Sequence, residues 1–166
     1  MFFSGKVRLT ALVASACWLA VPARALDFCD LVPASAVKSA LGISGNLVGK
    51  PTRNGGNGCA YTTGEPNTPD VVDANSSDYA GLIKTIADSR FGSSLGPNEE
   101  RVSGVGEAAV YTSKTNGNRQ GIFFRAKGKY VNLYVSAGGS NGVPKSAIVS
   151  LAAVVISKPI DQLKDP

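Results

Sequence analysis

Hydrophobic residues predominate in one continuous segment near the start of the chain and form short periodic segments after it. This apolar run covers residues 9–21, follows two basic residues, and precedes the small-x-small triplet Ala-Arg-Ala at 23–25. A charged start, an apolar centre and a small-residue cleavage site are the parts of a secretory signal peptide. The pattern predicts that residues 1–25 are removed on export, leaving a single mature domain over 26–166.

The apolar run fits two other fates, membrane anchoring and lipidation, less well than cleavage. A membrane anchor needs about 20 apolar residues, more than this run contains. Lipidation at Cys17 would need a lipobox, and Ala14-Ser15-Ala16 resembles one only loosely because Ala14 stands where leucine is usual. We therefore expect an exported protein, periplasmic or extracellular, with no stable membrane insertion.

The first part of the expected domain has the pattern of a helix followed by strands. Residues 33–41 carry apolar positions one helical turn apart, with proline at the start and glycine after the end. Strands are expected near 46–52 and 58–63, joined by a glycine- and asparagine-rich turn at 54–57. A third strand is expected around 71–74.

The middle of the domain combines a longer helix with a bent strand. Residues 78–90 place apolar side chains at i, i+3, i+4 and i+7 from Tyr79, which predicts an amphipathic helix. Residues 101–113 favour a strand bent at Gly104 and Gly106.

Residues 120–137 contain the clearest hairpin signal, two alternating segments joined by Lys127-Gly128. This turn places Phe124 opposite Val131. One face of the hairpin is expected to join the core, with Ile122, Phe124, Val131, Leu133 and Val135. The other face carries aromatic, basic and polar side chains, namely Phe123, Arg125, Tyr130, Asn132 and Tyr134.

The last helix is expected over residues 144–157, which are apolar on most sides and are followed by Pro159. It should be the central packing helix, and residues 160–166 should form a loosely held tail. The order of elements predicts an α+β fold. Its antiparallel sheet should have about five to six strands, with three helices packed mainly on one face.

Removal of the leader changes the charge of the chain. The full sequence has 17 basic and 12 acidic residues, and three of the basic residues but none of the acidic ones lie within 1–25. The net charge therefore falls from +5 to about +2 on cleavage. So small a charge in an exported protein gives no reason to expect a nucleic-acid partner.

Cys29 and Cys59 are the cysteines that remain after cleavage, an even number in an oxidising compartment. We expect them to form one disulfide, closing a loop of about 30 residues. A redox-active pair is the alternative, but such pairs usually have Cys-x-x-Cys spacing.

The sequence contains no histidine, which narrows the possible chemistry. Ser-His and Cys-His nucleophile systems are excluded, and the commonest zinc ligand is missing. We expect no metal, no cofactor and no catalytic residue. A hydrolase using carboxylates (Glu99, Glu100 or Glu107) or an adjacent Ser-Lys pair (113–114 or 157–158) stays open as an alternative.

Four short motifs follow one another along the mature chain. They are Cys29-Asp30-Leu31-Val32-Pro33, Ala40-Leu41-Gly42, Cys59-Ala60-Tyr61 and residues 102–109. In this order they resemble a broad class of small exported bacterial proteins of unknown function, many of them actinobacterial lipoproteins. The chain departs from that class in lacking a lipobox of the usual form. The resemblance implies a compact α+β domain with paired cysteines and implies no known activity.

Together these features predict a non-enzymatic, monomeric envelope or secreted binding protein. Its partner would be another envelope or secreted protein, or a small envelope ligand. The aromatic and basic hairpin face is the candidate binding surface, because aromatic residues and arginine are enriched where proteins bind partners. The structural alternatives are that another helix covers this face, or that Arg125 stacks across strands on Tyr130. Two further functions stay open: an inhibitor or immunity protein against an exported hydrolase, using loop 114–119, and a carrier of an apolar ligand between sheet and helices.

Overall fold

The structure is a computed structural model of the chain. It describes residues 26–52, 57–63, 72–76, 89–92, 95–113, 119–136 and 142–163. The expected signal peptide lies outside the described residues. So do most of the helix expected over 78–90 and most of the loop 114–119.

Two short helices precede the sheet. The first, α1 (Phe28–Leu31), begins after Asp27, whose carboxylate caps its first turn. The second, α2 (Ala34–Leu41), ends at Gly42 with a φ of 68°, a left-handed conformation that glycine adopts without steric cost. The second helix confirms the one predicted for this segment, whereas α1 was not predicted.

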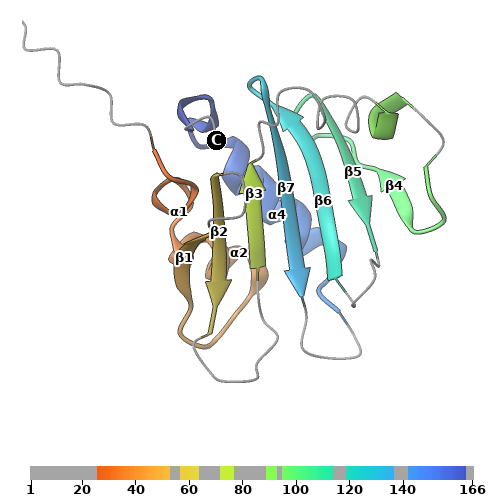
Figure 1. The fold of residues 1–166 in the computed structure, drawn as a ribbon. Helices are drawn as coiled ribbons and strands as arrows, with labels where there is room; N and C mark the ends of the chain where they lie inside the picture. The colour runs from red at the N-terminus through yellow and green to blue at the C-terminus, as the bar shows by residue number, and fades with distance from the viewer. Residues whose placement is uncertain are drawn as a thin grey trace, which may run out of the picture.

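The strands of the described residues form one antiparallel sheet in the order β1-β2-β3-β7-β6-β5-β4 (Figure 1). They are β1 (Val48–Thr52), β2 (Asn57–Thr62), β3 (Val72–Ser76), β4 (Glu99–Arg101), β5 (Ala108–Thr112), β6 (Arg119–Ala126) and β7 (Lys129–Ser136). The α+β class and the antiparallel pairing are confirmed. The described residues contain seven strands, however, which is more than the five to six expected.

The additional strand arises where one bent strand was expected over residues 101–113. There, β4 and β5 pair as a hairpin, with Glu99 opposite Thr112. The connection contains Gly104 and Gly106 at φ values of 77° and 58°. Positive φ at both glycines reverses the chain instead of bending it, so the prediction of a single strand was wrong.

The hairpin of β6 and β7 has the predicted register. Phe124 lies opposite Val131, and Ala126 opposite Lys129. Lys127 and Gly128 both have positive φ, at 51° and 74°. This is the backbone of a type I′ turn, whose twist matches that of the flanking strands.

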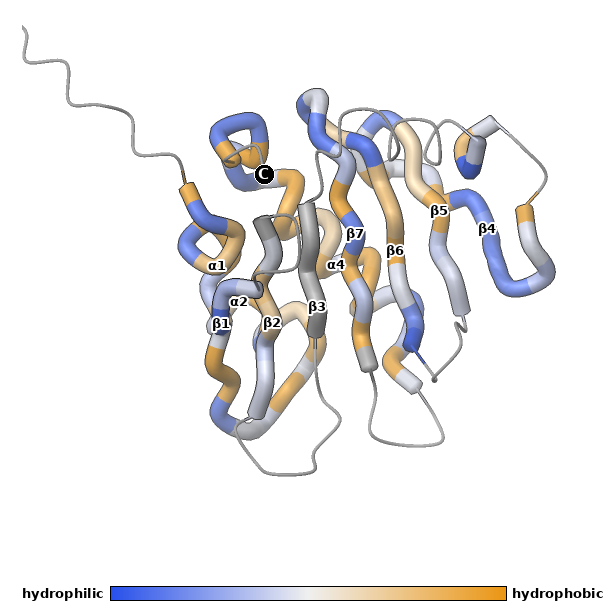
Figure 2. Tube along the Cα trace, in the orientation of Figure 1, coloured by the Kyte–Doolittle hydropathy of each residue, from blue (hydrophilic) through white to orange (hydrophobic). Residues whose placement is uncertain are grey.

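The core lies between one face of the sheet and the helices α2 and α4 (Lys145–Ile156), which lie behind the sheet in Figure 1. Helix α4 buries four residues: Ile148, Leu151, Ala152 and Val155. The predicted core face of the hairpin packs in the same cluster, which confirms its side assignment: Ile122, Phe124, Val131, Leu133 and Val135. At the far edge, β4 is a short strand of three charged residues, which are hydrophilic and blue in Figure 2. Charged residues on a short edge strand discourage pairing with another chain.

The C-terminal segment after α4 is more ordered than the loose tail expected over 160–166. Residues Ile160–Gln162 form a 3-10 helix, η1, and Ile160 is fully buried. Leu163 is also buried and forms a parallel β-bridge with Leu26. Two apolar residues three positions apart lie on one side of such a turn, which ties this segment to the core. Residues 164–166 lie outside the described residues.

The helices also differ in number from the expectation of three. Besides α1, α2, α4 and η1, residues 89–92 are helical. Helices α1, α2 and α4 contribute side chains to the core, whereas the 89–92 turn contacts the opposite face of the sheet through Phe91. This second contact shapes the candidate binding face.

Candidate binding face of the sheet

The predicted candidate residues share one face of the sheet, opposite the core. Phe123 pairs with Asn132, and Arg125 pairs with Tyr130, across the β6–β7 hairpin. Tyr134 lies on the same side, opposite Gly121. We call these five side chains, Phe123, Arg125, Tyr130, Asn132 and Tyr134, the outer hairpin face. The structure brings them together as the sequence predicted, although their binding role stays a prediction.

Phe123 is the centre of an aromatic stack on this face. Its ring lies between Phe91, at a centroid distance of 5.4 Å, and Tyr130, at 6.2 Å. The Arg90 guanidinium lies 5.8 Å from the Phe123 ring centroid. Because of these neighbours Phe123 is only 7% exposed, so its ring contributes mainly to the packing of the sheet.

Two residues of β4 contact the helical turn at residues 89–92 and hold it on this face. Arg101 donates a hydrogen bond from Nη2 to the Phe91 carbonyl at 3.0 Å. Arg90 Nη2 lies 3.7 Å from Glu99 Oε1. Cover of this face by another helix was one of the alternatives from the sequence, but Phe91, which provides the contact, lies just beyond the helix predicted to end at residue 90. An apolar residue directly before Gly92 was the available signal.

Arg125 remains a charged group at the border of the outer hairpin face. Its Nε lies 2.8 Å from Glu107 Oε2, an ion pair without the alignment of a hydrogen bond. A hydrogen bond with the Tyr130 side chain raises the pKa of Arg125 above its usual value, and the Glu107 carboxylate adds to the effect. The guanidinium therefore keeps its charge, and its side chain is 37% exposed.

The Tyr134 ring lies over a glycine on the neighbouring strand. A Cβ built on Gly121 would come within 2.8 Å of Tyr134 Cδ1 and 2.9 Å of the Leu133 carbonyl oxygen. Glycine therefore allows the aromatic ring to cover the strand backbone. Tyr134 and Asn132 are half-buried, so each keeps part of its surface accessible.

The close approach at Gly121 leads to a testable prediction. Substitution Gly121→Ala should lower the free energy of unfolding by about 1–3 kcal/mol, because the Tyr134 ring and a strand carbonyl would have to move. Chemical denaturation followed by circular dichroism measures the change. The matched control is Gly45→Ala, where a Cβ meets nothing within 4 Å. An equal loss in both variants would contradict the packing described here.

The carboxylates considered for hydrolysis are each engaged by a different cation. Glu99 pairs with Arg90, Glu100 with Lys145 at 3.0 Å, and Glu107 with Arg125. Glu99 and Glu100 are neighbours in β4, so their side chains point to opposite faces of the sheet. The three acids are therefore spread over separate ion pairs.

The serines of the two Ser-Lys pairs donate to backbone carbonyls. Ser113 Oγ donates to Asn98 at 3.3 Å, and Ser157 Oγ donates to Val154 at 2.6 Å. The Lys158 carbonyl accepts a hydrogen bond from the Lys127 ammonium at 2.7 Å, which joins the hairpin turn to the end of α4. Lys114 lies outside the described residues.

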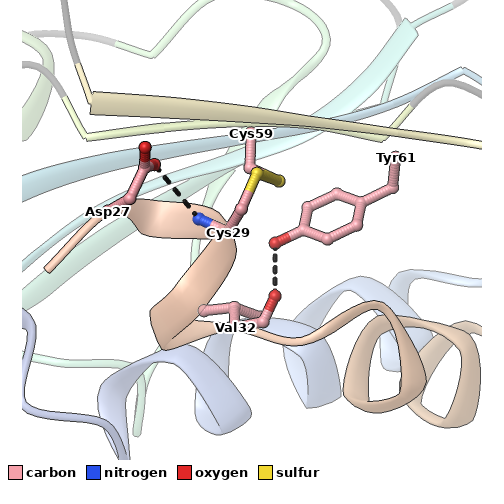
Figure 3. The surroundings of a disulfide bond; sticks show 5 residues. All are labelled: Asp27, Cys29, Val32, Cys59 and Tyr61. Carbon is pink, nitrogen blue, oxygen red and sulfur yellow. Dashed lines mark hydrogen bonds between the residues drawn. A yellow bond between two sulfur atoms is a disulfide. The ribbon is translucent and has the colours of Figure 1, made fainter. Parts of the chain in front are cut away.

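The predicted disulfide is present and joins α1 to β2 (Figure 3). The Cα atoms of Cys29 and Cys59 are 5.1 Å apart. Beside them, the buried Tyr61 hydroxyl donates to the Val32 carbonyl at 2.6 Å. Burial is the main cause that raises the pKa of Tyr61, with a smaller contribution from Asp27, so the phenol stays protonated. The disulfide and this hydrogen bond hold the first helix on the sheet.

The Tyr61 hydrogen bond carries a second prediction. Substitution Tyr61→Phe should lower the free energy of unfolding by about 1–2 kcal/mol, because it leaves a buried carbonyl without its donor. Urea denaturation of the purified protein measures the loss. Tyr134→Phe is the control, because the Tyr134 ring is half-buried on the other face of the sheet. Equal stabilities of Tyr61→Phe and the unmodified protein would show that the hydroxyl is not needed.

The residues that the structure describes contain neither a metal-binding cluster of acidic, histidine or cysteine side chains nor a membrane-spanning helix. Within that part of the chain, His, Cys, Asp and Glu do not gather in threes that could hold a metal ion. None of the helices described is both long and apolar enough to cross a bilayer. No protein-family model, curated protein or solved structure matches this chain.

Proposed function

We propose that this chain is an exported, non-enzymatic binding protein of the bacterial cell envelope or its surroundings, and a member of the class that its cysteine motifs resemble. The single observation that carries the proposal is the outer hairpin face. It offers Tyr130, Tyr134 and Arg125, residue types enriched in binding sites, on the paired strands of a hairpin. The partner that such a surface fits best is another exported protein.

The location follows from the leader and the cysteines. A disulfide between Cys29 and Cys59 is compatible with an oxidising compartment, and the leader at residues 1–25 is the route to it. The ion pairs of Glu99, Glu100 and Glu107 favour binding over carboxylate-based hydrolysis, because each acid is neutralised by a separate cation.

Site-specific crosslinking tests the binding role. A photoreactive phenylalanine analogue placed at Tyr134 should give a defined protein adduct when the chain is produced in its own envelope and irradiated. The same analogue at Lys38, on a helix that packs on the other face, is the matched control. Tyr130→Ser should abolish the adduct at position 134, because it removes another aromatic ring from the same face.

Absence of an adduct specific to position 134 would contradict a binding role for the outer hairpin face. If turnover also appeared in a broad hydrolase substrate screen, the non-enzymatic proposal would be overturned. Both readouts use the full-length chain, so neither depends on isolating a fragment.

A further inference from the structure

Leu26, the first residue expected after the leader, is already part of the folded domain. Its backbone N–H donates to the Gln162 carbonyl at 3.4 Å, and it forms a parallel β-bridge with Leu163. Leu163 is 4% exposed, and the Leu26 side chain packs against the core. In the folded protein, the nitrogen of the bond that export cleavage must break is therefore held against the C-terminal segment.

The residues that follow Leu26 are held more firmly. The Asp27 carbonyl accepts a hydrogen bond from the Leu31 N–H at 3.0 Å within α1. The Phe28 side chain is fully buried, and Cys29 is bonded to Cys59. The mature side of the cleavage site thus passes directly into a helix fixed by a disulfide (Figure 3).

This anchoring conflicts with proteolysis. A protease needs an accessible, extended segment on both sides of the bond that it cuts, and ordered backbone resists cleavage. In a folded substrate the rate falls with the population of the locally opened form. Cleavage directly before Leu26 in the folded protein would require Leu26 to leave Leu163, and Asp27 to give up the first turn of α1.

We propose that the Ala25–Leu26 bond is hydrolysed before Leu26 docks on Leu163 and before the Cys29–Cys59 disulfide closes. The inference rests on the proposed export of the chain. The C–N bond breaks, and water supplies a hydroxyl to the Ala25 carbonyl carbon and a proton to the Leu26 nitrogen. The amino group so formed then replaces the amide as the donor to Gln162. Cleavage, docking and disulfide closure follow in that order.

Cleavage of the full precursor by a purified signal peptidase in detergent tests this order. One sample is the folded precursor with its disulfide formed. A second is the precursor carrying C29A, C59A and F124A, shown by circular dichroism to be unfolded in the same buffer. A third is the folded, oxidised precursor with a short Gly-Ser spacer between Ala25 and Leu26. Mass spectrometry follows the rate and the position of the cut.

The unfolded precursor should be cut after Ala25. The folded precursor should be cut at about one tenth of that rate or at a lower rate. The spacer should restore the rate of the unfolded chain, because it moves the bond away from the docked residue. Equal rates for the folded and unfolded precursors, or a folded spacer precursor that stays slow, would overturn the order while leaving export intact. An unfolded precursor left uncut after Ala25 would overturn the proposed export itself.

Discussion

Substitution Phe124→Ala is expected to lower the free energy of unfolding by about 3–5 kcal/mol, the largest loss we predict for a single side chain. The Phe124 ring is fully buried on β6, opposite Val131, in the cluster shared with α4. Removing it deletes buried apolar surface and leaves a cavity that a paired strand cannot easily close. Guanidinium denaturation monitored by circular dichroism measures the change in midpoint and slope.

The matched control for Phe124→Ala is Val48→Ala on β1. Val48 is 41% exposed, so its truncation should change the free energy of unfolding by about 0.5 kcal/mol or less. Losses of similar size at both positions would contradict the assignment of the core to the face that carries Phe124. A change in slope as well as midpoint would show that the unfolded or folded ensemble itself had changed.

Loss of the disulfide is expected to have an effect of comparable size. The double variant Cys29→Ala/Cys59→Ala should lower the free energy of unfolding by about 3–4 kcal/mol, because the unfolded chain loses a cross-link across 30 residues. Alanine avoids placing a hydroxyl at the fully buried Cys59 position. Denaturation of the variant beside the oxidised protein measures the loss.

Chemical reduction supplies the control for the cysteine variant. The unmodified protein treated with dithiothreitol should lose a similar amount of stability, whereas the variant should not respond to the reagent. A variant as stable as the oxidised protein would mean that the disulfide constrains little. A variant still sensitive to the reductant would mean that the reagent acts elsewhere in the molecule.

Local signals were sufficient to predict the β6–β7 hairpin and helix α4. The Lys127-Gly128 turn determined the register of β6 and β7, and alternation along both strands identified the core face. Helix α4 was predicted from its apolar run and its flanking prolines. In the hairpin, turn chemistry and side-chain period agreed, so one register was favoured strongly.

The ordered C-terminal segment and the β4–β5 hairpin were not predicted. The burial of Ile160 and Leu163 depends on α4 and on Leu26, at the other end of the domain, which no local pattern reveals. Gly104 and Gly106 indicated that the backbone changes direction, but glycine alone does not specify whether the strand bends or the chain reverses. The hairpin of β4 and β5 could therefore be recognised only from the strand pairing seen in the structure.

The outer hairpin face was predicted as a set of residues, whereas its cover was foreseen only as an alternative without named residues. Alternation placed Phe123 and Tyr130 on one side of the hairpin, as the structure has them. The cover by Phe91, fastened by Arg101 and Glu99, comes from other segments, and it converts Phe123 from a candidate contact into a packed ring. Tyr130, Tyr134 and Arg125 remain the residues on which the binding proposal depends.

Mass spectrometry of the protein isolated from its native cell tests the central claim, passage through a membrane into an oxidising compartment, most directly. We predict an intact mass that begins at Leu26, and a non-reduced digest in which Cys29 and Cys59 occur in one cross-linked peptide pair. A product that retains Met1 and carries both cysteines as free thiols would contradict the account.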